Sequence, residues 1–240
     1  MTILRAACFS DIGKVRKENE DRMIFDESAM LFGVADGVGG LPGGGEAAQE
    51  AADVVSRAVR ALAPEGDIDM RAIVIRANES VVSLGMRISP GLGIGSTLTV
   101  GCVRRSRLKL AHVGDSRAFS LRNGHFACLT EDHSVENEAK RRRARGEVVY
   151  YSESQRGALT RCIGQVLAPE VDLSDLPLSA GDRFAFCTDG ITRMLSEKEL
   201  KETVGSSNQP AAIARALVNQ AVERGGPDNA TAVVFIVDAV

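Results

Sequence analysis

The chain has 240 residues, with 29 Lys and Arg against 32 Asp and Glu, so its formal net charge is −3. Its 44% hydrophobic and 25% charged residues are typical of a globular protein and exclude a disordered or collagen-like chain. The mildly acidic balance argues against broad electrostatic binding of nucleic acid. Because only 4% of the residues are aromatic and none is Trp, we expect a core of Ala, Val, Leu and Ile.

The cysteines and the apolar runs indicate the compartment. The five cysteines form no Cys-x-x-Cys pair and lie mostly in apolar stretches, so we expect buried thiols in a reducing environment. The N-terminal segment lacks the basic start and long apolar run of a signal peptide. No segment approaches the roughly 18 apolar residues that span a bilayer. These features predict a cytoplasmic protein with no membrane segment.

The first half of the chain alternates short apolar runs with two amphipathic segments. Runs typical of strands lie at 3–9, 22–26 and 30–35. Apolar residues recur at steps of three and four in 45–62 and 69–84, which predicts two helices. Alternating apolar and small residues then predict a strand at 96–103, followed by another at 107–113.

The second half begins with a hairpin. Asn123-Gly124 separates the strand-like segments 116–122 and 125–129, and both residues tolerate the positive φ of a type I′ turn. Helical periodicity returns at 132–145, 196–204 and 208–223, and strand-like runs return at 182–187 and 230–237. Strands in a block, then helices, then strands again predict an α+β fold with largely antiparallel sheets.

Carboxylates recur where the predicted strands end and turns begin. Asp36, Asp115 and Asp189 follow apolar strands, and Asp21 and Asp228 lie in turns. One Asp-Gly after an apolar run is usually a turn residue, but the repetition suggests that a sheet gathers these side chains into one site. Like charges raise one another's pKa, so such a cluster needs a cation. Oxygen ligands favour Mg²⁺ or Mn²⁺, and the Cys and His residues show no zinc-site spacing.

Arg16 is a candidate phosphate ligand. A planar guanidinium beside a carboxylate–metal cluster can donate two hydrogen bonds to a phosphate. The alternative is a surface salt bridge with Glu20, four residues later. Two metals that share a carboxylate can lower the pKa of a water between them, so the residues suggest metal-assisted hydrolysis of a phosphate ester. The glycines within 39–45 lack the pattern of a nucleotide P-loop.

Eight ordered motifs cover the chain from about residue 5 to residue 237. They are Ser10-Asp11-x-Gly13-x-x-Arg16-x-x-Asn19-Glu20-Asp21, Ala35-Asp36-Gly37-x-Gly39-Gly40, Gly95-Ser96-Thr97-Leu98, Val113-Gly114-Asp115-Ser116-Arg117, Thr130-x-Asp132-His133-Ser134, Leu159-Thr160-Arg161, Thr188-Asp189-Gly190 and Gly226-Pro227-Asp228-Asn229-x-Thr231. In this order and spacing they closely resemble the protein phosphatase 2C family of metal-dependent serine/threonine phosphatases, in its compact bacterial form. Each motif is weak alone, and their order makes the resemblance specific.

The resemblance implies a fold and a domain organisation. The implied fold is a four-layer α-β-β-α sandwich, in which helices flank a central antiparallel β-sandwich. The implied organisation is a single catalytic domain over 1–240, with a variable flap segment at about 134–158.

The same resemblance implies roles at a dinuclear Mn²⁺ or Mg²⁺ centre. Asp36 is expected to bridge the two ions, and the Gly37 carbonyl to bind one of them. Asp189 and Asp228 are expected to bind the other ion. The remaining implied roles are metal-bound waters on Glu20 and Asp21, a third and weaker ion on Asp115 with Asp189, and phosphate on Arg16.

These roles imply hydrolysis of phosphoserine and phosphothreonine by attack of a metal-bridging hydroxide, with Arg16, Asp36 and Asp189 as the catalytic residues. The expected partners are phosphorylated proteins and a bacterial-type Ser/Thr kinase that the enzyme opposes, and a monomer is expected. One alternative is a catalytically weak phosphoprotein-binding signalling module of the same fold. Another is a hydrolase of a different phosphate ester. The complete set of Asp36, Asp189 and Asp228 favours the protein phosphatase.

Several residues depart from the family pattern or leave a choice open. Val38 stands where many eukaryotic members have a His assigned as general acid, so a metal-bound water is the hypothetical proton donor. His133 is expected to hold a structural hydrogen bond, and His112 and His125 to lie in the core and on the surface. In the flap, 136–145 has more basic than acidic residues, which suggests either a solvated helix face or a basic edge that attracts phosphoproteins.

Overall fold

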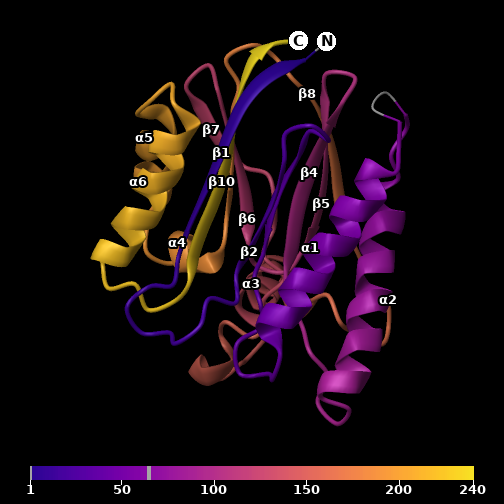
Figure 1. The fold of residues 1–240 in the computed structure, drawn as a ribbon. Helices are drawn as coiled ribbons and strands as arrows, with labels where there is room; N and C mark the ends of the chain where they lie inside the picture. The colour runs from indigo at the N-terminus through magenta and orange to yellow at the C-terminus, as the bar shows by residue number, and fades with distance from the viewer. Residues whose placement is uncertain (1, 64–65) are drawn as a thin grey trace.

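The computed structural model describes residues 2–63 and 66–240, and helices enclose two β-sheets in it (Figure 1). Its strands are β1 (Ile3–Asp11), β2 (Arg22–Asp26), β3 (Leu31–Ala35), β4 (Leu98–Arg104), β5 (Arg107–Val113), β6 (Arg117–Arg122), β7 (His125–Cys128), β8 (Asp172–Pro177), β9 (Arg183–Cys187) and β10 (Ala230–Ala239). Its helices are α1 (Gly44–Arg60), α2 (Met70–Ile88), α3 (Val135–Ala144), the 3₁₀ turn η1 (Glu153–Gln155), α4 (Asp189–Thr192), α5 (Glu197–Gly205) and α6 (Pro210–Glu223). The order of these elements confirms the predicted α+β class.

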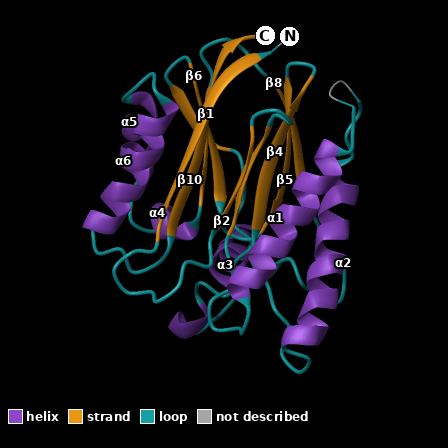
Figure 2. Ribbon diagram, viewed as in Figure 1, coloured by secondary structure: helices purple, strands orange, loops and turns teal. Residues whose placement is uncertain are grey.

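The strands form two five-stranded sheets. One has the order β1-β10-β9-β6-β7 and the other has the order β2-β3-β4-β5-β8. Neighbouring strands run antiparallel in both sheets. Helices α5 and α6 cover the outer face of the first sheet, and α1 and α2 cover that of the second (Figure 2). This arrangement confirms the implied four-layer sandwich.

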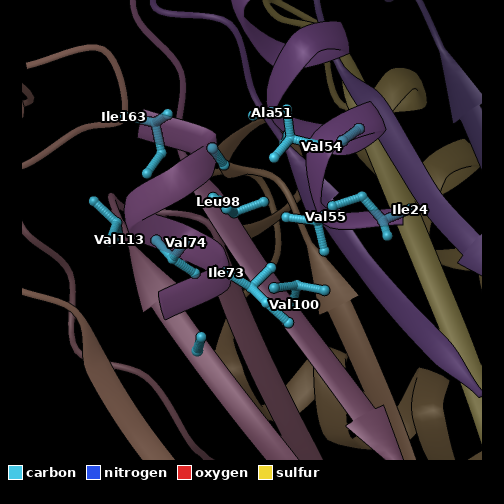
Figure 3. Close-up of a cluster of buried hydrophobic side chains, with 14 of the residues drawn as sticks. Ile24, Ala51, Val54, Val55, Ile73, Val74, Leu98, Val100, Val113 and Ile163 are labelled. Carbon is cyan, nitrogen blue, oxygen red and sulfur yellow. The ribbon is translucent and has the colours of Figure 1, made fainter. Parts of the chain in front are cut away.

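The core has an aliphatic layer and an aromatic layer. Between the second sheet and helices α1 and α2, side chains such as Val55, Ile73 and Val100 pack together, as the composition predicts (Figure 3). Between the two sheets, Phe rings fill the centre, and the ring centroids of Phe184 and Phe235 lie 4.7 Å apart. Facing sheets stand about 10 Å apart, and in this layer four buried Phe rings share the gap with eight buried aliphatic side chains. The expectation of an aliphatic core is therefore only partly correct.

Local sequence signals explain most element boundaries. Asn123 has φ 50° and Gly124 has φ 77°, which confirms the type I′ hairpin. The helix predicted over 132–145 is α3, and it begins at Val135 rather than at residue 132. It begins there because the Ser134 hydroxyl caps it by accepting a hydrogen bond from the Asn137 N–H at 3.3 Å. Strand β8 and the four-residue helix α4 were not predicted. Strand β8 is a polar edge strand, and α4 is too short to show a period.

The two chain ends lie at one end of the sandwich. Strands β1 and β10 pair from Ile3 opposite Ala239 to Asp11 opposite Ala230, so the termini lie side by side (Figure 1). The opposite end of the sandwich receives the ends of β3 and β9 and the connection from β5 to β6. Among the described helices, none has the length and apolar character needed to cross a membrane.

Candidate active site

Aspartates converge at the end of the sandwich opposite the termini. Asp36 follows β3, Asp189 follows β9 and Asp115 connects β5 to β6. Asp21 immediately precedes β2, and Asp228 lies in the loop before β10. The structure thus brings all of these predicted site residues together, and both sheets contribute strand ends.

Four of these aspartates border a cleft of 610 Å³. Its lining includes Arg16, Asp36, Gly37, Val38, Leu41, Asp115, Asp189, Arg193 and Asp228. Asp21 is only 5% exposed and lies outside this lining. The cleft is therefore polar on the side of the strand ends and apolar around Val38 and Leu41.

Burial and mutual repulsion shift the acidity of these carboxyl groups. Burial raises the pKa of Asp36 well above its usual value, and the charges of Asp21 and Asp189 raise it further. Burial likewise raises the pKa of Asp21 and of Asp115 to about 7. The pKa of Asp189 is also raised, mainly by burial. Carboxylates held this close cannot all stay ionised at neutral pH without added positive charge, so the cluster has the chemistry of a cation site.

The carboxyl group of Asp21 supports the same conclusion. Its Oδ2 accepts a hydrogen bond from the Thr188 hydroxyl at 2.8 Å, whereas its buried Oδ1 has no hydrogen-bond partner among the residues that the structure describes. A buried carboxylate oxygen without a donor is costly, and a hydrated cation would satisfy it. The oxygen-rich donor set suits a hard divalent cation. In the described parts of the chain, no three of the acidic, His or Cys side chains are already arranged around one point as ligands.

Arg16 pairs with one member of the cluster. Its Nη2 lies 2.8 Å from Asp228 Oδ2, and Asp228, rather than the Glu20 of the salt-bridge alternative, is its partner. A Cβ at Gly39 would lie 3.1 Å from Arg16 Nη1, so the glycine leaves room for the guanidinium to lie across the backbone. The arginine therefore lines the cleft beside the carboxylates, where a phosphate ligand is expected.

Close backbone approaches at two glycines fix the positions of the loops that carry the aspartates. A Cβ at Gly190 would lie 1.9 Å from the Asn229 carbonyl oxygen, so only glycine allows the loops of Asp189 and Asp228 to approach this closely. A Cβ at Gly37 would lie 2.4 Å from the Gly44 carbonyl carbon, which holds the Asp36 loop against the start of α1. These glycines bring carboxylates from different strands to one point.

Side-chain hydrogen bonds hold the loop that carries Arg16 and Glu20 in place. The Asn229 amide donates to the carbonyl oxygens of Ile12 and Glu18 at 2.9 and 3.0 Å, and its Oδ1 accepts from the Glu20 N–H at 2.8 Å. The Glu20 Oε1 accepts a hydrogen bond from the Gly45 N–H at 3.3 Å, at the start of α1. The loop that carries Arg16 and Glu20 is thus tied to both β10 and α1.

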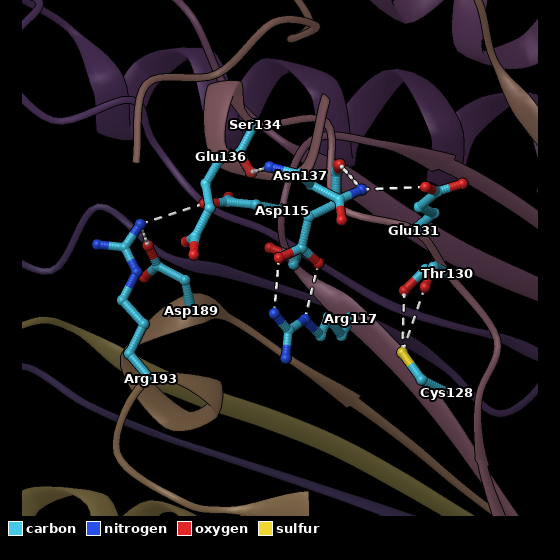
Figure 4. Close-up of polar contacts among 12 residues, drawn as sticks. Asp115, Arg117, Cys128, Thr130, Glu131, Ser134, Glu136, Asn137, Asp189 and Arg193 are labelled. Carbon is cyan, nitrogen blue, oxygen red and sulfur yellow. Dashed lines mark hydrogen bonds and ion pairs between the residues drawn. The ribbon is translucent and has the colours of Figure 1, made fainter. Parts of the chain in front are cut away.

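Arg193 lies within the cluster, and our sequence analysis did not single it out. Its Nη2 is 2.6 Å from Asp189 Oδ2 and 3.2 Å from Asp115 Oδ2 (Figure 4). The only available signal was its position four residues after Asp189, the spacing of an ion pair on one helical face. Arg193 also borders a second cleft of 510 Å³, which Arg117 of β6 and the flap residues Lys140 and Arg156 line as well.

The basic residues of the flap are mostly neutralised by nearby acids. Lys140 and Arg156 both pair with Glu136, at 2.9 and 2.8 Å. Arg142 pairs with Glu147 at 2.6 Å. These exposed pairs favour a solvated helix face over a basic edge, although Lys140 and Arg156 do reach the second cleft.

The histidines lie outside the cleft lining. His133 is buried, and its Nδ1 accepts a hydrogen bond from the Gly114 N–H at 3.1 Å while Nε2 lies 3.2 Å from Asp172 Oδ2. His112 is buried beside it, with ring centroids 4.7 Å apart. His125 is exposed on β7. Val38 does line the cleft, so an apolar side chain occupies the position where the family pattern often has a His.

Comparison with known proteins gives the family. The family model described as "Protein phosphatase 2C" matches residues 9–230. The serine/threonine protein phosphatase PstP of Mycobacterium tuberculosis is 34% identical over 239 residues, a match that covers 97% of this chain but only 45% of the relative. The serine/threonine phosphatase stp of Listeria monocytogenes is 30% identical over 230 residues, covering 92% of this chain and 91% of the relative.

Solved structures agree with this result. The catalytic domain of PstP in complex with two manganese ions superposes with a TM-score of 0.84 and 30% identity, covering 99% of this chain and 100% of the other. This chain spans about half the length of the mycobacterial relative and nearly all of its catalytic domain. On the family match, the relatives and the fold together, the chain belongs to the protein phosphatase 2C family.

Proposed function

We propose that the chain is a metal-dependent protein phosphatase that removes phosphate from phosphoserine and phosphothreonine. The observation that carries this proposal is the buried group of aspartates with raised pKa values beside Arg16. Family membership supports it, because the relatives are named serine/threonine phosphatases. One domain over 1–240, with the flap at about 134–158, would carry the activity.

The carboxylates and one backbone carbonyl would hold two Mn²⁺ or Mg²⁺ ions. Asp36 would bind both ions, with the Gly37 carbonyl on one and Asp189 and Asp228 on the other. Asp21 and Glu20 would accept hydrogen bonds from waters on the ions, a role that suits the unpartnered Asp21 Oδ1. Asp115 with Asp189 would hold a weaker third ion. When bound, such ions supply a water that is deprotonated near neutral pH.

The side chains of the chain bind and orient the phosphate. Arg16 is long, charged at all relevant pH values and placed on the cleft wall, so it can exchange Asp228 for two phosphate oxygens. Asp36 and Asp189 would hold the cations beside that phosphate and offset their charge. Val38 cannot donate a proton, and in the part of the chain that the structure describes no His lines the cleft. The proton for the leaving alkoxide would therefore come from a water held by the ions, as the sequence predicts.

The substrates would be phosphorylated protein segments, and the expected counterpart is a bacterial-type Ser/Thr kinase. The cleft carries two cationic side chains in its lining, Arg16 and Arg193, which suit a phosphorylated segment. We expect a cytoplasmic monomer. The alternative is a catalytically weak module of the same fold that only binds phosphoproteins, and retention of the full carboxylate set argues against it.

The test is Mn²⁺-dependent release of phosphate from a phosphothreonine peptide. Wild type should turn over with Mn²⁺ and stop with chelator, whereas Asp36→Ala and Asp189→Ala should be inactive. Asp175→Asn is a matched control, because Asp175 pairs with Lys109 on the β5–β8 edge, outside the cleft lining. Peptide binding without metal-dependent turnover by wild type would favour the binding module and overturn the enzyme.

A further inference from the structure

Arg193 connects two carboxylates through one nitrogen atom. Its Nη2 lies 2.6 Å from Asp189 Oδ2 and 3.2 Å from Asp115 Oδ2 (Figure 4). The two oxygens belong to different connections, one after β9 and one between β5 and β6. The guanidinium nitrogen therefore occupies the place between these oxygens where an ion shared by Asp115 and Asp189 would have to lie.

A guanidinium and a divalent ion cannot share this place. Both would need the same two oxygens, and both are positive at every pH at which the carboxylates are ionised, because Arg does not lose its proton in proteins. Two cations within a few ångströms repel each other strongly in a site with little water. Occupancy by one therefore requires departure of the other.

Arg193 has room to leave. Its side chain is 53% exposed, whereas those of Asp115 and Asp189 are 10% and 12% exposed. It lines both the 610 Å³ cleft and the 510 Å³ cleft, at the wall that they share. A Cβ at Gly157 of the flap would lie 3.4 Å from Arg193 Nη2, so the flap backbone stays close to the guanidinium without blocking it.

We infer that Arg193 is an internal counter-cation of the Asp115–Asp189 pair and competes with a third divalent ion for it. At low metal concentration the chain holds the two ions of the proposed function, and Arg193 stays between Asp115 and Asp189 as the third positive charge. A third ion binds only at a higher concentration, when it displaces the guanidinium. This inference rests on the proposed function for the two-ion centre, and it adds a competitor for the weaker third ion expected on Asp115 with Asp189.

The experiment counts bound Mn²⁺ at increasing free Mn²⁺, from the electron paramagnetic resonance signal of the free ion. Wild type should show two tighter sites and a weak third. Arg193→Gln and Arg193→Met should tighten the third site at least about tenfold, the change expected when charge-assisted hydrogen bonds no longer compete. The two tighter sites should change less. Proteins are purified with Mn²⁺, which replaces the lost counter-charge, and are then dialysed.

Control variants distinguish competition by Arg193 from a general effect of removing a cation, and one outcome tests the proposed function separately. Arg156→Gln removes a cation from the same cleft wall and should leave the third site unchanged, because Arg156 pairs with Glu136. Adding Asp115→Asn to Arg193→Gln should abolish the tightened site. The inference is overturned if both Arg193 variants bind the third ion as wild type does. Absence of the two tighter sites in wild type would instead overturn the proposed function.

Discussion

The charged side chains of the carboxylate cluster are buried beside like charges, whereas those of the flap are exposed beside opposite charges. In the cluster, Asp36 and Asp189 are buried among like charges, and their pKa values are raised by burial and by these neighbours. In the flap, Arg142 and Glu147 are exposed and pair at 2.6 Å. Buried like charges create a strong demand for a cation, whereas exposed opposite charges are screened by water and contribute little. The environment of a charge, more than the number of charges, decides whether a segment can form a binding site.

The largest expected effect comes from removing a buried charge of the cluster. Asp36→Asn should lower Mn²⁺-dependent phosphate release by at least about 10³-fold, because an amide cannot neutralise two cations at the reacting centre. Initial rates with a phosphothreonine peptide measure it. Retention of a tenth of wild-type activity would remove Asp36 from the centre.

The second effect comes from Arg16, the cationic side chain that lines the cleft beside the carboxylate cluster. Arg16→Ala should lower kcat/KM by about 10- to 100-fold, the loss expected for charge-assisted hydrogen bonds to a phosphate. Arg16→Lys should recover only part of it, because an ammonium cannot form the planar two-point contact. Equal kcat/KM for Arg16→Lys and wild type would show that charge alone suffices.

Without metal, the free energy of unfolding of the protein should fall as the pH rises. The pKa of Asp21 and of Asp115 is about 7 in the folded chain against 3.8 for an unperturbed Asp, so the folded state holds more protons between these values. The stabilisation is complete below about pH 4 and is lost as the pH rises through about 7, by on the order of a few kcal/mol.

Urea unfolding with chelator at pH 5 and pH 8 measures this change. Mn²⁺ should restore stability most at pH 8, where the carboxylates are ionised. Asp21→Asn should weaken the pH dependence, because one of the titrating groups is gone. Stability that increases from pH 5 to pH 8 without metal would contradict the assignment.

The smallest expected effect lies in the flap. A double-mutant cycle of Arg142→Gln and Glu147→Gln should give a coupling free energy below about 1 kcal/mol. Phosphate release from the peptide should change less than about twofold, since neither side chain lines the clefts. A tenfold loss in Arg142→Gln would revive the interpretation of the flap as a basic substrate edge.

The sequence predicted the elements that carry strong local signals. Periodicity identified α1, α2 and most strands, and the turn residues Asn123 and Gly124 identified the β6–β7 hairpin. The aspartates were identified because each follows or precedes an apolar strand, and a sheet necessarily brings strand ends together. The order of the motifs then gave the family and the four-layer fold.

The remaining features depend on contacts between distant segments. Strand β8 lies at a sheet edge beside β5, and its two leucines, Leu173 and Leu176, are three residues apart and fall on opposite faces, so its own sequence does not show the alternation of a strand. The aromatic layer arises because Phe32 and Phe235, from different sheets, meet between them. The role of Arg193 depends on the pairing of β6 with β9, which brings Asp115 and Asp189 to its guanidinium. No local pattern contains such information.

The pairing of β1 with β10 has a practical consequence. Because Ile3 lies opposite Ala239, a short linker could join the two ends, and new termini could be opened in an exposed loop such as that at Gly181. Such a circular permutant would keep every strand of the first sheet. A tag, a surface tether or a fused reporter attached beside Ile3 or Ala239 would stand a full strand length from the cleft. The molecule can therefore be immobilised by its ends while the cleft faces the solution.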